Sequence, residues 1–582
     1  MKNRYYPVLY LWKYLGGNRK FKLFLFFVLM VLSVFADIIS ISAIIPFLSA
    51  LTNPEILMTQ EWFKPVIEIL NIKSSNELLL PLTVGFVGAS IFAAIIKIAL
   101  LWFNSQLSLD MGVELKTKVF KKTLYQPYEY HISRNSSELI SLVTQKVGSA
   151  IAAGILHTLT MVTAVINSVT IVFTLILIKP YVALTAFILF GGGYFIIGKI
   201  VKNIIKKNGE IIRDTQPLAV KTLQEGLGGI RDIIIDSNQD IFIKQYETIA
   251  YKSESAGMRN TFLANLPKHI MEVFSICLIA FLAYYMQVVK GETQSLPILG
   301  ALALGAQKLL PSLQQIYYSW SLINANLPIM EEVVKQLNLK VKKSDIQDKL
   351  TFKNSIILKD ISYKYANSKD YVLNNIFLEI KKSQKVGFIG QTGSGKSTLL
   401  DIIMGLLYPQ KGEIFIDDIP INQQNISKWQ KNIANVPQTI FLSDTSIAEN
   451  IAFGIPKDKI DLKRVKEVAQ MASLDNFIET LPKKYDTKVG ERGVQLSGGQ
   501  RQRIGIARAL YKQAEVIVFD EATSALDDKT EKSVMDAINN LDKNLTILMI
   551  AHRLSTLKEC DVIYEIENGT IKIVDKDRIF AK

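Results

Sequence analysis

The segment GQTGSGKS, Gly390 to Ser397, fits the pattern G-x-x-x-x-G-K-[ST]. The apolar run before it, Val386 to Ile389, predicts a strand, and the residues from Ser397 to Leu407 predict a helix. Backbone N–H groups of such a loop, at the positive end of a helix, bind phosphate oxygens. Lys396 would neutralise the β and γ phosphates of a nucleotide, and the hydroxyl of Ser397 would bind Mg²⁺. The segment therefore predicts an α/β nucleotide-binding domain, since a glycine-rich turn that binds nothing would not need this strand and helix.

A second segment, VIVFDE, follows more than a hundred residues later and ends in Asp520 and Glu521. Its apolar residues predict a buried strand, and a phosphate site needs carboxylates at the end of such a strand. We expect Asp520 to hold Mg²⁺ and Glu521 to act as general base on the attacking water. His552 follows a further predicted strand, Thr546 to Ile550, and could hydrogen-bond a γ-phosphate, although an isolated histidine is more often a surface residue.

A third segment, LSGGQRQRIGIARAL, Leu496 to Leu510, resembles the signature of ATP-binding cassette (ABC) proteins. Ser497 can cap the following helix, and Gly498 and Gly499 let backbone amides approach an anion. A site with its own phosphate loop does not need a second anion-binding helix end in the same subunit. The resemblance implies that Ser497, Gly498, Gly499 and Gln500 act in trans, on ATP held between two cassettes that meet head to tail.

Other positions match the same family. Tyr365 matches the aromatic residue that stacks on adenine, Gln438 matches the glutamine that senses Mg²⁺ and water, and the segment Val489 to Gln495 resembles an exporter-specific segment. The resemblance implies catalytic roles for Glu521, His552 and Gln438, and metal binding by Ser397, Gln438 and Asp520. The implied ATP-binding residues are Tyr365, Gly390, Gln391, Thr392, Gly393, Ser394, Gly395, Lys396, Ser397 and Thr398.

The composition indicates a membrane protein. Of 582 residues, 49% are hydrophobic, and the mean hydropathy is +0.22, which is too apolar for an ordinary soluble enzyme. The net charge of +14 could suggest nucleic acid, but many basic residues flank apolar runs, as in cytoplasmic membrane anchoring. The cysteines, Cys277 and Cys560, provide no disulfide framework and are expected to be small buried side chains.

Six apolar stretches are long enough to cross a bilayer. Segments rich in Lys and Arg alternate with them, and by the positive-inside rule both termini are cytoplasmic. Nothing predicts a cleavable signal. The predicted spans are Phe21 to Leu51, Leu78 to Phe103, Ala150 to Ile178, Tyr181 to Lys199, Leu263 to Val289 and Leu296 to Ile323.

Over essentially its whole length the chain resembles a half-size ABC exporter. This implies an all-α transmembrane domain of six spanning helices over residues 1–338, a linker over 339–354, and an α/β P-loop NTPase cassette over 355–582. Short coupling helices are expected near Pro127 to Asn135 and Gly229 to Asp236. An external amphipathic helix is expected within residues 53–72.

Four ionisable residues fall within predicted spans: Asp37, Lys97, Glu272 and Lys308. Each is costly in lipid, so each should face a cavity or a partner. Lys97 and Lys308 could receive the phosphate or pyrophosphate group of a substrate. Alternatively, Asp37 could pair with Lys97, and Glu272 with Lys308.

The family implies an ATPase in the inner or plasma membrane, working with Mg²⁺ as a pair of half-transporters, most simply a homodimer. The external helix and the segment Phe441 to Gly454 resemble half-transporters that flip lipid-linked oligosaccharides, so the expected substrate is such a lipid or a glycolipid. The alternatives are export of another amphiphile, such as a drug, lipid or peptide, and an ATP-gated channel or a regulatory protein that does not hydrolyse ATP.

Overall fold

The computed structural model divides into two compact units, residues 1–126 with 134–341, and residues 127–133 with 342–582. We describe each unit by itself. The residues described are 5–14, 20–52, 55, 58, 68, 75–178, 180–284, 296–341, 348–366, 368–521, 529, 531–532, 535–536, 545–550 and 557–576. The expected external helix therefore lies outside the described residues, apart from three single positions.

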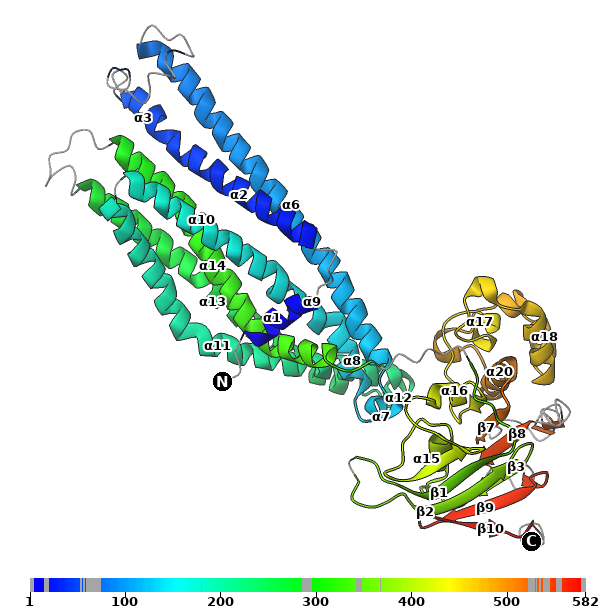
Figure 1. The fold of residues 1–582 in the computed structure, drawn as a ribbon. Helices are drawn as coiled ribbons and strands as arrows, with labels where there is room; N and C mark the ends of the chain where they lie inside the picture. Colours follow the sequence, from blue (N-terminus) through cyan, green and yellow to red (C-terminus); the bar gives the residue numbers. More distant parts are fainter. Residues whose placement is uncertain are drawn as a thin grey trace. The chain divides into compact units, whose positions relative to one another are not determined.

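The first unit is a bundle of long helices (Figure 1), in which α2 pairs with α6, α10 with α14, and α11 with α13. Within the described residues, five helical segments are long and apolar enough to span a membrane. α14 forms where the sixth span is predicted. The helices are α1 (Tyr6–Lys13), α2 (Lys20–Ser42), α3 (Ile44–Thr52), α6 (Leu79–Leu124), α8 (Ser136–Ser141), α9 (Val147–Ile151), α10 (His157–Ile178), α11 (Pro180–Gly228), α12 (Ile230–Ile235), α13 (Gln239–Tyr284) and α14 (Leu296–Leu337), with a short 3₁₀ turn η3 (Ser75–Leu78).

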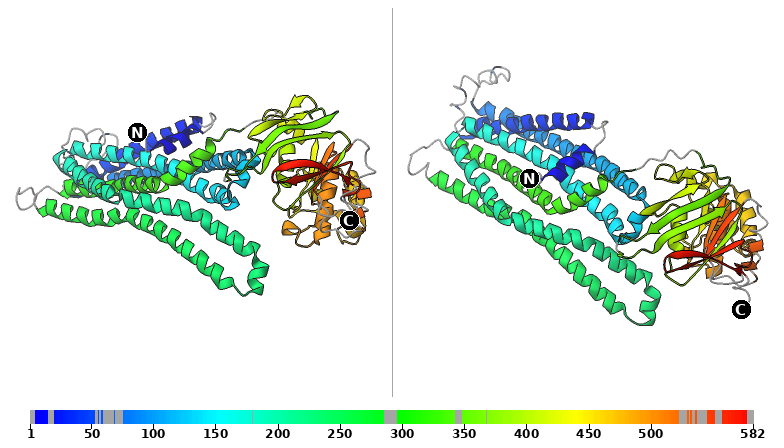
Figure 2. Two further views of the ribbon diagram at one scale, coloured as in Figure 1. Left: turned by 90° about the horizontal axis from the view of Figure 1, so that it is seen from below. Right: turned by 60° about the horizontal axis from the view of Figure 1, so that its bottom comes forward.

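Several spans continue beyond their apolar part without a break. α6 joins the predicted second span to a polar helical stretch that ends at Leu124, and α11 continues past its apolar half in the same way. The short helix α12 lies at the end of the long hairpin that α11 and α13 form (Figure 2), at the place predicted for a coupling helix.

The helical stretch Ser136–Leu177, which includes most of the predicted third span, contains two π-helical turns, η4 (Leu142–Lys146) and η5 (Ala152–Leu156), on either side of α9. Lys146 in η4 is buried and forms an ion pair of 2.7 Å with Glu332 of α14. The carbonyl of Gly154 in η5 accepts a hydrogen bond of 3.1 Å from the indole of Trp12 in α1. The neighbouring helices thus hold both π-turns in place.

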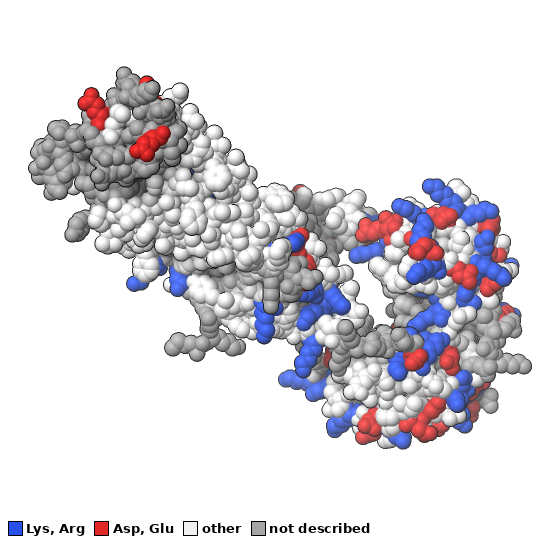
Figure 3. Space-filling model, turned by 45° about the horizontal axis from the view of Figure 1, so that its top comes forward, with Lys and Arg blue, Asp and Glu red and all other residues white. Residues whose placement is uncertain are grey.

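The charged groups of this unit are unevenly distributed. On the face shown in Figure 3, uncharged residues cover the middle of the bundle, Lys and Arg gather toward one end, and acidic residues lie at the other. Large apolar side chains such as Phe24, Ile98 and Phe195 are exposed along the spans, as expected of a lipid-facing surface. Cys277 on α13 is exposed, so the expectation that it is buried is wrong; Cys560 is buried as expected.

The second unit is an α/β domain with two sheets. A four-stranded antiparallel sheet has the order β2-β1-β4-β5, and a six-stranded sheet has the order β10-β9-β3-β8-β7-β6, in which β9 to β6 are parallel. The strands are β1 (Ser355–Tyr363), β2 (Leu373–Lys381), β3 (Lys385–Ile389), β4 (Lys411–Ile416), β5 (Ile419–Pro420), β6 (Ile433–Val436), β7 (Val516–Asp520), β8 (Thr546–Ile550), β9 (Val562–Glu567) and β10 (Thr570–Val574).

Both faces of the parallel sheet are covered, which explains its continuous apolar strands. In β7, Val516 and Val518 pack toward the four-stranded sheet and α15, whereas Ile517 and Phe519 pack toward α17, α18 and α20. The helices are α7 (Tyr128–Ile132), α15 (Lys396–Ile403), α16 (Ile426–Gln430), α17 (Ile447–Ile451), α18 (Leu462–Met471), α19 (Asp475–Glu479) and α20 (Gly498–Tyr511), with short 3₁₀ turns η7 (Lys457–Lys459), η8 (Lys484–Asp486) and η9 (Glu491–Gly493). Ser383, in the turn between β2 and β3, has φ 67°, a conformation that favours glycine.

Candidate functional site: a phosphate loop and a membrane cavity

The predicted phosphate loop connects β3 to α15, and its glycines have backbone angles that other residues rarely adopt. Gly390 has φ 144°, and a Cβ there would lie 2.3 Å from the carbonyl oxygen of Ile566. Gly395 precedes α15 with φ 104°. These two positions shape a loop whose amides lead directly into the start of a helix, where an anion is stabilised.

Two side chains of the loop are suited to an anionic ligand. Lys396 is only 7% exposed, and its Nζ donates hydrogen bonds to the carbonyls of Gly390 (2.8 Å) and Gln391 (2.9 Å). Burial lowers the pKa of Lys396, while the charges of Glu521 and Asp520 raise it. The hydroxyl of Ser394 is buried without a hydrogen-bond partner among the described residues. An orphaned hydroxyl and a buried ammonium group fit a phosphate.

The two carboxylates lie beside the loop, as predicted. The Ser397 hydroxyl donates a hydrogen bond of 3.4 Å to Oδ1 of Asp520. Burial raises the pKa of Asp520, and the hydrogen bond from Ser397 lowers it in part. A hydroxyl oxygen next to a carboxylate oxygen is the ligand type that Mg²⁺ prefers, so these residues fit that ion.

Glu521 follows the strand in a left-handed conformation, with φ 50°. Its Oε2 accepts a hydrogen bond of 2.7 Å from Nε2 of Gln438. A non-glycine residue with positive φ is uncommon and often marks a functional site. The structure therefore brings together Lys396, Ser397, Asp520, Glu521 and Gln438. His552 lies outside the described residues.

Tyr365 lies next to the phosphate loop. Its hydroxyl is 3.0 Å from the Thr398 hydroxyl, and its ring contacts Tyr363 edge-on at 5.2 Å between centroids. Thr392 and Gly393 lie exposed at the tip of the loop. An exposed phosphate loop beside an aromatic ring is the arrangement that a nucleotide site requires.

Sequence analysis missed Asp401, which lies on α15 one turn beyond the loop. Burial, followed by the charge of Asp520, raises its pKa to about 6. Tyr128 of α7 belongs to the same compact unit. Burial raises the pKa of Tyr128, and the charges of Asp401 and Tyr365 raise it further. A motif search could not find Asp401, because the burial of this residue in the fold, and not a sequence motif, raises its pKa.

The signature segment forms the predicted capped helix. The Ser497 hydroxyl accepts a hydrogen bond of 3.2 Å from the Gln500 amide, and the Gln500 side chain accepts one of 2.8 Å from the Ser497 amide. Gly498 and Gly499 form the first turn of α20. In the described part of the cassette, no hydrogen bond or ion pair connects residues 497–500 to residues 390–397. The helix end remains available to another ligand.

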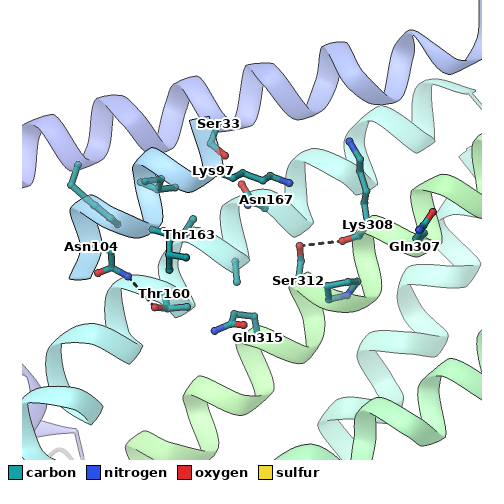
Figure 4. Close-up of a pocket in the computed structure, with 15 residues that line it drawn as sticks. Ser33, Lys97, Asn104, Thr160, Thr163, Asn167, Gln307, Lys308, Ser312 and Gln315 are labelled. Atoms are coloured by element: carbon teal, nitrogen blue, oxygen red, sulfur yellow. Dashed lines mark hydrogen bonds between the residues drawn. The ribbon is translucent and has the colours of Figure 1, made fainter. Parts of the chain in front are cut away.

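The helical unit contains a polar cavity of about 440 Å³ between α2, α6, α10 and α14. Figure 4 shows polar side chains from these helices around one space, among them Thr160, Thr163 and Asn167 on one face of α10. Both candidate lysines, Lys97 and Lys308, line this cavity. The other polar residues were not predicted, although the spacing of Thr160, Thr163 and Asn167 is that of one helix face.

Asp37 pairs with both lysines. Its Oδ1 lies 2.9 Å from Nζ of Lys97 and 3.4 Å from Nζ of Lys308, and Lys308 also donates to the Ser40 hydroxyl at 3.0 Å. The predicted pair of Asp37 with Lys97 is confirmed. The predicted pair of Lys308 with Glu272 is wrong, because Glu272 instead lies near two residues one turn earlier on α13, Lys268 (4.0 Å) and His269 (3.3 Å). Two lysines thus share one carboxylate.

Comparison with known proteins gives consistent results. The family description "ABC transporter transmembrane region" matches residues 23–298, and "ABC transporter" matches residues 373–524. An ATP-dependent lipid A-core flippase of Saccharophagus degradans is 29% identical over 82% of both chains. A multidrug resistance-like ATP-binding protein MdlA of Buchnera aphidicola is 30% identical over 87% of both chains. A solved structure of a bacterial Atm1-family ABC exporter with ATP bound is similar in fold, with a TM-score of 0.79 and 21% identity over 97% of this chain and 96% of that one.

Proposed function

Because the chain belongs to the ABC transporters, as an exporter that carries a membrane region and an ATPase cassette, we propose that it exports an anionic amphiphile, a lipid-linked oligosaccharide or a glycolipid. The cassette binds ATP, and the chain is an ATPase coupled to movement of a substance across the membrane. The nature of that substance rests on the cavity in the helical unit.

The net positive charge of the cavity is the observation that carries the proposal. Lys97 and Lys308 supply two positive charges, and Asp37 supplies one negative charge, so one positive charge remains uncompensated in this group. Such a charge inside a membrane is costly without a partner. An anionic headgroup would provide that partner. One relative is named as a flippase of a lipid, lipid A-core, which supports a lipid cargo.

Polar atoms of the same wall also favour a hydroxyl-rich headgroup. Ser33 Oγ, Asn104 Oδ1 and Asn167 Oδ1 are buried and have no hydrogen-bond partner among the described residues. The amide nitrogen of Asn104 already donates to Thr160 at 3.1 Å, so only its oxygen is unsatisfied. Unsatisfied polar atoms are costly in a membrane interior. Sugar hydroxyls can satisfy them, whereas a purely apolar drug cannot.

At the nucleotide site we assign roles to the residues that lie together. Lys396 would exchange the carbonyls of Gly390 and Gln391 for the β and γ phosphates, and Ser397 and Asp520 would hold Mg²⁺, which would supply charge neutralisation when bound. Glu521 accepts a proton from the attacking water, and Gln438 orients Glu521 through their 2.7 Å hydrogen bond. Tyr365 stacks on adenine. For His552, which lies outside the described residues, we propose contact with the γ-phosphate on the family resemblance alone.

The capped end of α20 supports a pairing of two chains. The amides at Gly498 and Gly499 point outward from a helix start that its own phosphate loop does not use, and they would complete the site of a second copy. A two-fold pair would bury two ATP molecules between the cassettes, and α7 and α12 would transmit that closure to the helical units. We place both termini and the cassette in the cytoplasm and the helical unit in the inner or plasma membrane.

The test is translocation and ATPase activity of the purified protein in liposomes. We expect a polyprenyl-pyrophosphate sugar or an acidic glycolipid to stimulate hydrolysis and to be moved, while zwitterionic phospholipid and cationic drugs do neither. Lys308→Met should abolish the stimulation and leave basal hydrolysis intact. Lys22→Met, which breaks a lysine–aspartate contact between α2 and α6 outside the cavity, is the matched control. Stimulation by drugs alone would favour multidrug export, the alternative that the MdlA-like relative suggests.

A further inference from the structure

The helical unit contains a second, larger cavity of about 650 Å³ between α10, α11 and α14. Met161 and Val165 of α10 line it, whereas Thr160, Thr163 and Asn167 of the same helix line the first cavity. The two spaces therefore lie on different faces of α10. A ligand in the second cavity would not occupy the proposed translocation cavity.

The charges of this second cavity are uncompensated. Two lysines of α11, Lys199 and Lys202, line it, and no Asp or Glu does. Neither lysine has an ion-pair partner within the part of the chain that the structure describes. By contrast, Asp37 partly neutralises the lysines of the first cavity, and Glu272 accompanies Lys268 in a third cavity beside α13.

The rest of the wall is apolar and aromatic. The rings of Tyr194, Tyr317 and Trp320 line the cavity. The hydroxyls of both tyrosines already donate to other groups, Gln314 Oε1 at 3.2 Å and the Leu263 carbonyl at 3.1 Å. Because both hydroxyls are already hydrogen-bonded, the aromatic rings are the parts of these side chains that remain for contact with a ligand. The indole N–H of Trp320 has no hydrogen-bond partner among the described residues, so it is a further donor at this wall.

Two glycines of α11 leave space beside these rings. A Cβ at Gly191 would have nothing within 4 Å, and a Cβ at Gly198 would lie 3.5 Å from Tyr317 and Trp320. From Gly191 to Lys202 the helix rises by about 16 Å. The apolar end of the cavity lies within the predicted fourth span, and the two lysines lie at its polar end, as in sites where a charged headgroup meets the membrane interface.

We propose that this cavity binds a membrane phospholipid with an anionic phosphate headgroup, one molecule per chain. The phosphate lies on Lys199 and Lys202, and an acyl chain runs along Tyr194, Tyr317 and Trp320. Given the membrane orientation proposed above, the lipid comes from the cytoplasmic leaflet. It is a resident lipid and not the exported substrate, because the two cavities lie on different faces of α10.

Fluorescence quenching by brominated lipids tests this site directly, because Trp320 belongs to its wall. In nanodiscs, brominated phosphatidylglycerol should quench tryptophan emission more than brominated phosphatidylcholine at equal content. Trp320→Phe should remove most of that excess. The double variant Lys199→Ala/Lys202→Ala should weaken the apparent affinity for phosphatidylglycerol at least about fivefold, and the double Lys→Arg variant should retain it.

Lys206→Ala is the matched control, because Lys206 lies on the same helix, pairs with Glu210 at 3.4 Å and does not line the cavity. Equal quenching by the two lipids, or an excess that survives the double alanine variant, would overturn the proposal. Displacement of the lipid by soluble glycerol phosphate at the same concentration would assign the site to a free anion instead. Lys308→Met should leave the quenching unchanged. The quenching assay therefore tests the lipid site and the liposome assay tests the proposed export function, and either can fail without the other.

Discussion

Replacing Asp37 with Asn should destabilise the helical unit measurably. The Asp37 side chain is only 2% exposed, and its Oδ1 lies 2.9 Å and 3.4 Å from the nitrogens of Lys97 and Lys308. At an effective dielectric constant of about 20, such pairs attract by roughly 5–6 kcal/mol each, and the cost of burying the carboxylate offsets much of this. Because the substitution also removes the cost of burying the carboxylate, we expect a net loss of only roughly 2–3 kcal/mol.

The assay is thermal unfolding of the full-length protein in detergent. In a unit of this size, the expected loss corresponds to a fall in Tm of roughly 3–5 °C. Asp110→Asn is the control, since Asp110 pairs with Lys22 at a more exposed site, and it should shift Tm by less than about 2 °C. If Asp37→Asn melted within about 2 °C of the parent protein, the shared carboxylate would not hold these helices together. Asp37→Asn should also increase the affinity for an anionic lipid, because it leaves the cavity more positive.

Glu521→Gln should reduce phosphate release at least about a hundredfold while nucleotide binding persists, and unchanged turnover would contradict its role as base. Asp401→Asn should stabilise the cassette at pH 7–8 by roughly 1–2 kcal/mol, because burial raises the pKa of Asp401 to about 6 and thus penalises its charged form. Since the folded parent favours the protonated form, its stability should fall as pH rises from about 4 through 6. Denaturant unfolding of the variant and the parent at several pH values measures this. A stability difference between the two proteins that persists at pH 4 would refute the raised pKa of Asp401. Ser383→Gly should raise the stability of the cassette by about 0.5 kcal/mol, because φ is 67° at this turn, and a lower Tm would show that the Ser383 side chain contributes more than its strain costs.

The sequence predicted the secondary structure around the phosphate loop well, because phosphate binding requires fixed residue types at fixed spacing. The loop from Gly390 to Ser397, the strand ending at Asp520 and the cap at Ser497 are all where the motifs indicate. The partner of Lys308 could not be predicted. Hydropathy places a residue in a span but does not say which helix faces it, so Glu272 and Asp37 were equally good candidates.

Hydropathy also could not show that spans continue as single helices. The polar part of α6 after Phe103 keeps a helical sequence, so the helix extends to Leu124 although its apolar part ends earlier.

The raised pKa of Asp401 was missed for a related reason. Its environment arises from strands and helices that are distant in sequence, and a short motif carries no information about them.

The two π-turns of the stretch Ser136–Leu177 have a consequence for protein engineering. A π-turn accommodates one residue more than an α-turn, and each residue of an α-helix turns the chain by about 100°. Deleting one residue within 152–156 should restore regular α geometry there and keep Thr160, Thr163 and Asn167 facing the space they line, whereas a deletion within 157–159 would turn them away by about 100°. Homologues or designed chimeras that differ by one residue within this π-turn should thus keep the same polar face toward the cargo, so the turn is a place where chain length can vary without changing the cavity.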